Sequence, residues 1–446
     1  MDALLDLSDP TNPREAEWPA AEFIVGNPPF LGGSLLRSGL GADYTETLWS
    51  VFDDRASANV RPMLLLAREG AGPDRGEGDE ASGPARDPGH SGQQDRRVLE
   101  RINESGGIFF ARSDDPWVLS GANVHISFVG QDDGGEAPAE LDGATVAGIN
   151  ANLTVGLDLT LARRLQENLG IAFEGDKKGG PFEIDDAMAK ILLAVPNPDD
   201  RSNTAVRPWV NGQDLYGRRA RRWIVDFGVD MPEHQAALYE APFQHILGAV
   251  RQTTMRPANW WRHGRPRPEM RAAVAGRQRT IATVRHSKHR IWTWLDAAVL
   301  PDSALVVVAE DDDYTFGVLH SRVHEVWARA TGTQLREVES GFRHTPTRFE
   351  TFPFPRPTDE SREAITAAAR ELARLRDGWL NPPGLDPAEL GRRTLTNLYN
   401  ARPTWLGHAH AALDTAVLAA YGWPPDLTAE PLLAALLALN LAREPA

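Results

Sequence analysis

The residues Asn27-Pro28-Pro29-Phe30 combine groups that could bind a planar amino group. An Asn amide oxygen and a proline carbonyl both accept hydrogen bonds, so together they can hold one exocyclic nitrogen and direct its lone pair at an electrophile. A neighbouring aromatic ring can stack on a base, and the prolines keep the loop preorganised. The simpler interpretation is a proline-rich turn with Asn as the turn former, and four residues alone leave both open.

The elements around this motif place it at the rim of a sheet. The apolar run Phe23 to Val25 predicts a strand that the prolines end, and ligands of open α/β sheets bind beyond the carboxyl ends of strands. VLERINESG (98–106) is typical of a helix end, and IFFARS (108–113) and VHISFVG (124–130) predict two further strands. This alternation predicts a wound α/β sheet in residues 1–150.

Three further regions follow in the chain. Residues 151–195 are expected to be a mostly helical connector, because LTLARRLQENLG has helical spacing. Residues 196–357 mix strand-like runs with loops rich in proline and arginine. Residues 358–446 carry apolar residues at three- and four-residue spacing, which predicts a helical C-terminal domain.

The bulk composition sets limits on location and partners. The chain has 446 residues, enough for several domains, and its formal net charge of -15 argues against a protein that coats nucleic acid nonspecifically. The absence of cysteine excludes disulfides and thiolate metal sites. The sequence has neither a signal-peptide pattern nor a run of about 20 apolar residues. We therefore expect a soluble, cytoplasmic protein with no membrane partner.

A basic region stands out against this acidic background. Residues 251–290 interleave arginines with Trp260, Trp261 and three histidines, and Glu269 is their one acidic residue. Such a surface could follow phosphates, while the alternative is a solvated face with intramolecular ion pairs. His286 and His289 lie three apart in basic surroundings, which disfavours a metal site. The candidate DNA-binding residues are Arg218, Arg219, Arg221, Arg222, Arg262, Arg265, Arg267, Arg285, Lys288 and Arg290.

Several blocks of the sequence resemble one family. NPPFLGGSLLRSGLGADYTETLWSVF resembles motif IV of N6-adenine DNA methyltransferases, in the branch of type IIG/IIL (MmeI-like) restriction-modification enzymes. The resemblance continues through 96–130, 206–228, 340–355 and 392–423, in the family's order. It implies a partial class I (Rossmann-like) methyltransferase sheet in 1–150, a mixed α+β target-recognition domain in 196–357 and a helical region in 358–446.

The resemblance also implies roles for the motif and its ligands. Asn27 and the Pro28 carbonyl would hold the adenine amino group, Pro29 would stiffen the loop, and Phe30 would stack on the flipped base. The implied activity is that of a site-specific, adenine-specific DNA methyltransferase. S-adenosylmethionine would be the cofactor and double-stranded DNA the partner.

The family's cofactor motif is not found in this sequence. A glycine-rich turn is expected after the first strand, but MDALLDLSDPTNPREAEWPAAE, which precedes Phe23, contains no glycine. We therefore expect the chain to begin within the methyltransferase domain and to be inactive alone. A separately encoded N-terminal methyltransferase or nuclease fragment is the expected partner.

One segment departs from the family pattern. Residues 62–95 are rich in Gly, Pro, Ala, Arg and Asp, which predicts either disorder or translation out of frame. One back-translation of GPARDPGHSG (83–92), shifted by one base, encodes GLLATQGIRG, which resembles the family at this position. A genuine surface insertion is the alternative.

Other functions remain open at this stage. The chain could be a DNA-recognition module without catalysis, or half of a split enzyme. Asn-Pro-Pro-aromatic loops also serve N5-glutamine methyltransferases of proteins, although the long basic region argues against that function.

Overall fold

The computed structural model describes most of the chain. The described residues are 5–9, 12–16, 23–25, 41–51, 81–83, 85–86, 99, 102–103, 106–119, 122–132, 134–135, 138–151, 153–197, 201–218, 222–250, 258–331 and 342–445. The chain divides into two compact units, Met1–Thr160 and Leu161–Ala446, and each is described by itself.

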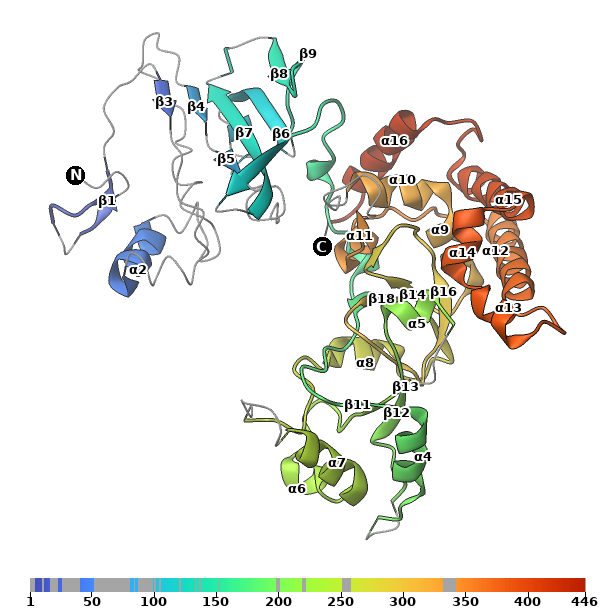
Figure 1. Ribbon diagram of the computed structural model, residues 1–446. Helices are drawn as coiled ribbons and strands as arrows, with labels where there is room; N and C mark the ends of the chain where they lie inside the picture. Colours follow the sequence, from blue (N-terminus) through green and yellow to red (C-terminus); the bar gives the residue numbers. More distant parts are fainter. Residues whose placement is uncertain are drawn as a thin grey trace. The chain divides into compact units, whose positions relative to one another are not determined.

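The N-terminal unit contains a mixed sheet (Figure 1). Its strand order is β3-β4-β7-β6-β8-β9, with β5 also paired to β7. The pairs β3–β4 and β6–β8 are parallel, and the remaining pairs are antiparallel. The strands are β3 (Phe23–Val25), β4 (Ala81–Gly83), β5 (Ala85–Arg86), β6 (Gly107–Leu119), β7 (Ala122–Asp132), β8 (Ala139–Leu141) and β9 (Ala144–Val146).

The predicted strands of this unit are confirmed. β3 has the expected bounds, and β6 and β7 extend beyond the expected 108–113 and 124–130 into one long hairpin. Ile108 and Ala111 of β6 and Val129 of β7 are buried with Leu99 and Ile149, which gives the sheet a small core of its own. The unit also contains the pair β1 (Leu5–Asp6) and β2 (Arg14–Glu15), and helix α2 (Ala42–Val51), which buries Thr45 and Leu48.

The compositionally odd segment 62–95 falls mostly outside the described residues. Its described part, β4 and β5, lies in the sheet. β4 pairs with β3 in parallel, and β4 and β5 each pair with β7 in antiparallel. These five residues are therefore strands, where the sequence predicted disorder. The out-of-frame interpretation stays a prediction, which sequencing of the gene tests.

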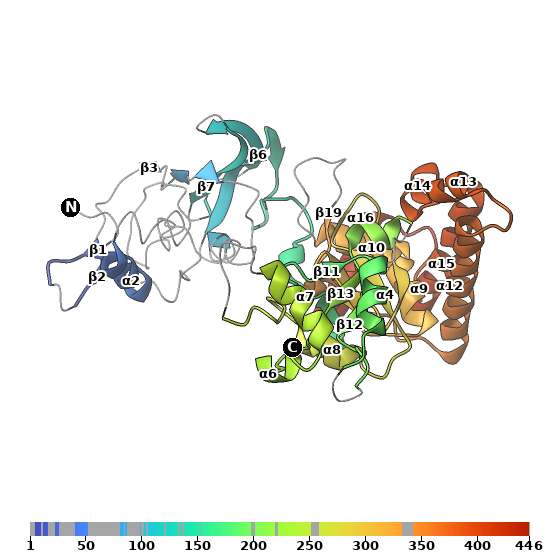
Figure 2. The ribbon, with the colours of Figure 1, turned by 60° about the horizontal axis from the view of Figure 1, so that its bottom comes forward.

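The C-terminal unit is built around two four-stranded sheets (Figures 1 and 2). One sheet, order β10-β18-β14-β16, is antiparallel throughout, and the other, order β11-β13-β12-β17, has one parallel pair. Their strands are β10 (Ala172–Glu174), β11 (Glu183–Ile184), β12 (Val206–Val210), β13 (Arg222–Val225), β14 (Arg279–Val284), β16 (Thr293–Asp296), β17 (Leu300–Pro301) and β18 (Leu305–Val308). A small pair, β15 (His286–Ser287) with β19 (Phe342–Arg343), completes the unit.

Helices cover the two sheets at opposite ends of this unit. The first group lies around β11–β13 and comprises α4 (Asp186–Ala194), α6 (Glu233–Ala236), α7 (Glu240–Val250) and α8 (Pro268–Val274). The second group lies beyond β14, β16 and β18 and comprises α9 (Asp313–His320), α10 (Arg322–Ala330), α11 (Pro346–Glu350), α12 (Asp359–Leu380), α13 (Pro387–Arg392), α14 (Leu395–Ala401), α15 (Thr404–Tyr421) and α16 (Ala429–Leu441). The short helix α5 (Gly212–Tyr216) follows β12 directly. The helical C-terminal region predicted from residue 358 onward is confirmed.

Sequence features explain why some of these strands and helices form. All four residues of β18, Leu-Val-Val-Val, are buried, as expected of a central strand covered on both faces. Asp312 and Thr358 accept hydrogen bonds from backbone N–H groups at the starts of α9 and α12, which satisfies donors that lack helical partners. The chain therefore has the predicted mixed α/β architecture with a helical C-terminal region.

The prediction of a mostly helical connector, 151–195, is wrong for most of its length, because the α-helix of its described residues is α4 and the rest forms 3-10 turns, short strands and loops. LTLARRLQENLG forms only the 3-10 turns η3 (Leu159–Leu161) and η4 (Gln166–Asn168). The buried Leu165 donates its N–H to the Glu350 carbonyl (2.8 Å), and the Asn168 amide donates to the carbonyl of Phe352 (2.7 Å). These long-range bonds replace helical ones, and the segment then supplies β10 and β11 to the two sheets.

Candidate nucleic-acid interface

The predicted catalytic motif lies outside the described residues. This holds for Asn27, Pro28, Pro29 and Phe30, and also for two predicted DNA-binding residues, Arg219 and Arg221. The strand immediately before the motif, β3, is in place at one end of its sheet. The candidate site is therefore built from the C-terminal unit alone.

Five predicted DNA-binding arginines have partners within the chain. Arg222 pairs with Asp214 (3.1 Å), while Arg267 and Arg285 both pair with Glu174. The remaining two, Arg218 and Arg262, donate to carbonyl oxygens: Arg218 to Leu380 and Leu390 at the ends of α12 and α13, and Arg262 to Val229. Ion pairs and backbone bonds therefore account for these guanidinium groups, the alternative that the sequence had left open.

Arg290 is in the interior of the unit. It is 6% exposed and donates to the carbonyls of Leu319 and Ser321. Burial lowers its pKa to about 10, with nearby charges of both signs adding smaller effects. As a correction to the sequence prediction, Arg290 has no exposed guanidinium for a phosphate, and its place is in the core.

Two predicted residues have exposed side chains without an ion pair in the described part of the chain. Lys288 follows the short strand β15, and Arg265 lies in the segment before α8. These two remain the candidates for contact with a polyanion.

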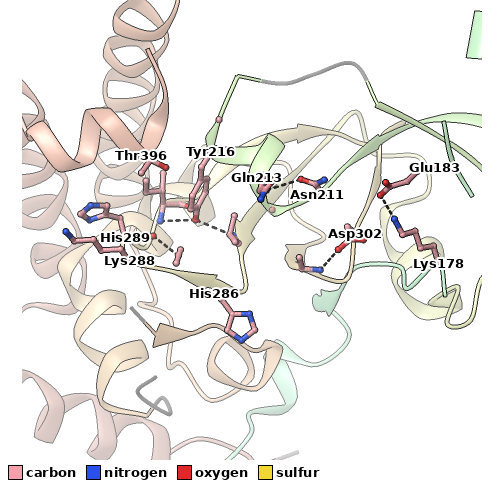
Figure 3. A pocket seen from close by; sticks show the side chains of 16 residues that line it. Lys178, Glu183, Asn211, Gln213, Tyr216, His286, Lys288, His289, Asp302 and Thr396 are labelled. Atoms are coloured by element: carbon pink, nitrogen blue, oxygen red, sulfur yellow. Dashed lines mark hydrogen bonds and ion pairs between the residues drawn. The ribbon is translucent and has the colours of Figure 1, made fainter. Parts of the chain in front are cut away.

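Lys288 lines a cavity of about 810 Å³ (Figure 3). The walls come from the start of α5, the 284–291 segment, the turn at 302–304 and Thr396 of α14. Lys288 and His289 lie at one end, and the Lys178–Glu183 ion pair (2.5 Å) lies at the other. Asn211 accepts from the N–H groups of Gln213 and Asp214, which fixes the start of α5 and leaves the Gln213 side chain exposed at the wall.

Tyr216 lines the cavity and fixes the backbone beside it. Its hydroxyl is buried and donates to the carbonyl of Ile291 (2.6 Å), and Thr283 lies at 2.8 Å from the same oxygen. The backbone of the 284–291 segment is thereby fixed against α5. His289 contacts the Asn400 side chain of α14 (2.7 Å), so the far wall is fixed as well. The side chains at the cavity are therefore carried on an ordered frame.

The charges lining the cavity nearly balance. Burial would raise the pKa of Glu183, but hydrogen bonding and charge from Lys178 outweigh it and lower that pKa. Burial raises the pKa of Asp302, against a hydrogen bond from the Ala304 N–H. Burial lowers the pKa of His286, and Arg285 and Arg343 lower it further, so this imidazole is neutral at pH 7. Two lysines and two carboxylic acids thus face a cavity rich in donors and acceptors, a lining suited to base edges more than to phosphate.

A buried network lies beneath the same region. We call Asp176, His263, Arg271 and Asp226 the carboxylate network. Asp176 accepts from His263 Nδ1 and Arg271 Nη2 (both 2.7 Å), and Arg271 Nη1 donates to Asp226 (2.7 Å). His263 Nε2 lies 2.9 Å from the Val225 carbonyl, which requires that nitrogen to donate. The network ties β13 to the segments before and after it.

Lys177, Lys178 and Gln213 were not among the DNA-binding residues predicted from the sequence. The segment EGDKKGGPF (174–182) has two adjacent lysines followed by two glycines, a pattern that indicates an exposed basic turn. Gln213 has no local signal, because only the fold brings it to the same cavity as Lys288. In the described part of the chain, no group of three or more His, Asp or Glu side chains is placed to hold a metal ion. Nor does any described helix have the length and apolar character needed to cross a bilayer.

Comparison with known proteins shows that the fold is similar to that of one solved protein. The solved structure reported as "Structure of Type IIL restriction-modification enzyme MmeI in complex with DNA has implications for engineering of new specificities" matches 94% of this chain with a TM-score of 0.68 at 20% identity. At that identity the likeness shows a shared fold. The match spans 57% of the MmeI chain. No family model and no curated protein matches the sequence.

Proposed function

We propose that this chain carries the target-recognition part and the catalytic loop of a site-specific DNA methyltransferase in a restriction-modification system. The observation that carries the proposal is the likeness to MmeI, an enzyme solved with DNA, over 94% of the chain. The Asn-Pro-Pro-Phe motif, directly after β3, supports adenine N6 as the methyl acceptor.

The proposed roles follow from the chemistry of the motif. Asn27 and the Pro28 carbonyl accept hydrogen bonds from the adenine amino group, which leaves the lone pair of that nitrogen directed at the methyl donor. Phe30 stacks on the extruded base and Pro29 keeps the loop rigid. Their partner is double-stranded DNA.

S-adenosylmethionine is the methyl donor that the motif implies. A site for it needs a short glycine-rich turn joining a strand to a helix, and a carboxylate for the ribose hydroxyls. The described strands and helices of the N-terminal unit present no such short turn, and the sequence before Phe23 has no glycine. The described residues of this unit therefore do not make this site, and we propose that a partner fragment supplies it.

Target recognition is assigned to the cavity of the C-terminal unit. Gln213 and Lys288 present an amide and an ammonium group at its wall, groups that read adenine and guanine edges in the major groove. Selection of bound duplexes from a random library, followed by anisotropy titration of the full chain, tests this assignment. Q213A and K288A should each reduce discrimination at one base position by about 1–3 kcal/mol.

K190A is the matched control for these two variants. Lys190 is an exposed lysine that pairs with Asp186 on α4 (2.6 Å) and does not line the cavity. Its removal should leave the selected sequence unchanged. A wild-type chain that binds all duplexes equally, or binds none, would contradict the proposal.

Methyl transfer needs its own experiment. The full chain is combined with the N-terminal part of a type IIL enzyme and labelled S-adenosylmethionine, and incorporation into the selected duplex is counted. N27A should abolish incorporation while DNA binding is retained, because Asn27 acts on the amino group after the base is extruded. Undiminished incorporation by N27A would remove Asn27 from the mechanism.

A second candidate is a DNA-recognition module that carries out no catalysis. It is favoured by the C-terminal unit, which has its own buried cores and contains the cavity. Sequence-selective binding without methyl transfer, alone or with the supplied fragment, would select this function.

A further inference from the structure

Two basic segments of the C-terminal unit meet in a short backbone bridge. Lys177 N donates to the Arg265 carbonyl and Arg265 N donates to the Lys177 carbonyl, both at 3.0 Å. Gly264 N donates to the Lys178 carbonyl (2.9 Å), which extends the contact by one residue. In such a mutually bonded antiparallel pair the two Cα atoms lie about 5.5 Å apart, and the two side chains are close neighbours.

Glycines allow the two segments to approach so closely. Gly179 has a φ of +68°, and a Cβ added there would lie 3.3 Å from the Gly264 Cα. A side chain at this position would be strained by the backbone conformation and crowded by the opposite segment. The segment 176–179 is thus shaped to hold its lysines against 263–265.

The carboxylate network anchors both segments from below. Asp176, which is fully buried, directly precedes Lys177, and His263 precedes Arg265 by two residues. The Asp176–His263 contact (2.7 Å) therefore joins the two segments a second time, beneath the bridge. Asp176 N also donates to the Pro301 carbonyl (2.8 Å), next to Asp302 at the cavity wall.

The two residues of the bridge, Lys177 and Arg265, place two positive charges at the protein surface. Lys177 and Arg265 are both exposed, and within the described ranges neither side chain forms an ion pair. Like charges at directly opposed positions destabilise a strand pair. Lys190, Arg329 and Arg374 show the common alternative in this unit, since each pairs with an acid within four residues. An anion from outside the described chain would relieve the repulsion between Lys177 and Arg265.

We propose that Lys177 and Arg265 form a two-cation clip that holds one phosphate of the DNA backbone, beside the cavity that faces the bases. This inference rests on the proposed DNA-recognition function. Guanidinium and ammonium groups together offer several donors to the phosphate oxygens, and charge-assisted bonds of this kind are short and strong. The rigid bridge supplies the preorganisation, because the network beneath it fixes the backbone of both residues.

The dependence of DNA affinity on salt measures the clip. Each phosphate that a protein neutralises contributes about 0.9 to the slope of log affinity against log salt concentration. K177A and R265A should each weaken binding about tenfold at low salt. The double variant should lower the slope by about 0.9, and not by about 1.8, because both residues hold one phosphate.

Matched variants separate charge from structure. K177R and R265K keep the charge and should retain most of the affinity, while K190A should change neither affinity nor slope. The Ala variants alter exposed side chains only, so their thermal unfolding should match that of the wild-type chain.

The outcomes distinguish this clip from the function on which it rests. Sequence-selective binding with unchanged slopes in K177A and R265A would overturn the clip and leave DNA recognition standing. A slope loss of about 1.8 in the double variant would assign two phosphates and overturn the shared site. A wild-type chain that binds no duplex would overturn both.

A second arm distinguishes the DNA backbone from a free anion. Inorganic phosphate, added at constant ionic strength, should not raise the unfolding temperature. A free phosphate ion would contact only Lys177 and Arg265, which is too little to bind it measurably. A rise that K177A abolishes, with DNA binding unaffected, would assign the clip to a free anion and overturn the proposal.

Discussion

Two buried networks in the C-terminal unit hold cations in opposite ways. In the carboxylate network, Arg271 lies between the carboxylates of Asp176 and Asp226. In what we call the imidazole network, Arg376 bonds to His320 Nε2 (2.7 Å) and the Trp292 carbonyl (2.9 Å), and Arg290 bonds to His324 and to carbonyls. The described residues give Arg290 and Arg376 no ion pair of their own.

Because their partners differ, the two networks are expected to respond differently to acid and to mutation. Burial would raise the pKa of Asp226, but hydrogen bonding and charge from Arg271 outweigh it and lower that pKa. Burial lowers the pKa of His320 and His324 well below 6.5, and the neighbouring arginines, Arg376 and Arg290, lower it further. One network therefore depends on ionised acids, and the other on neutral imidazoles.

The largest expected effect is that of breaking the carboxylate network. R271M leaves two buried carboxylates without their main counter-charge, and we expect it to lower the free energy of unfolding by about 3–5 kcal/mol. Urea denaturation followed by tryptophan fluorescence measures the change. R374A, which removes an exposed pair with Glu371, is the control and should leave the unfolding curve unchanged. A loss in R271M no greater than in R374A would contradict this account.

Acid should weaken the imidazole network first. His410, whose ring centroid lies 6.2 Å from that of His320, extends this network. Burial, followed by Arg376, lowers the pKa of His410 to about 4, so the unfolded chain binds a proton at this site near pH 6.5 while the folded chain does not. This stability is complete above pH 6.5 and is lost as the pH falls toward 4, by up to about 3 kcal/mol for His410. The contribution of Asp226 is lost only at still lower pH, below its ordinary value of 3.8, because its pKa is lowered.

Unfolding measured between pH 7 and pH 4 tests this order. H410Q removes one half-buried imidazole and should flatten the pH dependence, whereas H408Q, at an exposed position, should not. A stability that stays constant down to pH 4 would show that the imidazole network does not control acid unfolding.

The smallest of the three effects is expected for Arg376. R376M removes a cation whose partners are a carbonyl and a neutral imidazole, so it leaves unsatisfied polar groups but no unpaired charge. We expect a loss of about 1–3 kcal/mol, less than for R271M, in the same urea experiment. A loss equal to that of R271M would remove the distinction between the two networks.

The sequence predicted elements that depend on local pattern. The strand before Asn27, the two strands of the β6–β7 hairpin and the helices from residue 358 onward follow from apolar spacing and turn residues, and the structure confirms them. The helix predicted for 159–170 does not form, because the backbone of this segment bonds to Glu350 and Glu444, residues far along the chain. Periodicity alone does not reveal such partners.

The candidate site was predictable only in part. The concentration of arginines in 251–290 was visible, and Arg265 and Lys288 from that region stayed exposed. Which arginines were neutralised was not visible, because Glu174, Asp176 and Asp226 lie far from their partners in sequence.

The sequence by itself determined the type and order of the confirmed strands and helices, because local sterics and apolar spacing act over a few residues. It also predicts a chemistry for the Asn-Pro-Pro-Phe loop. The tertiary structure alone decided which cations face outward. Burial makes an unpaired charge costly, so the fold brings distant carboxylates, carbonyls and imidazoles to most arginines. Lys177 and Arg265 stay exposed and lie directly opposite each other in a backbone bridge.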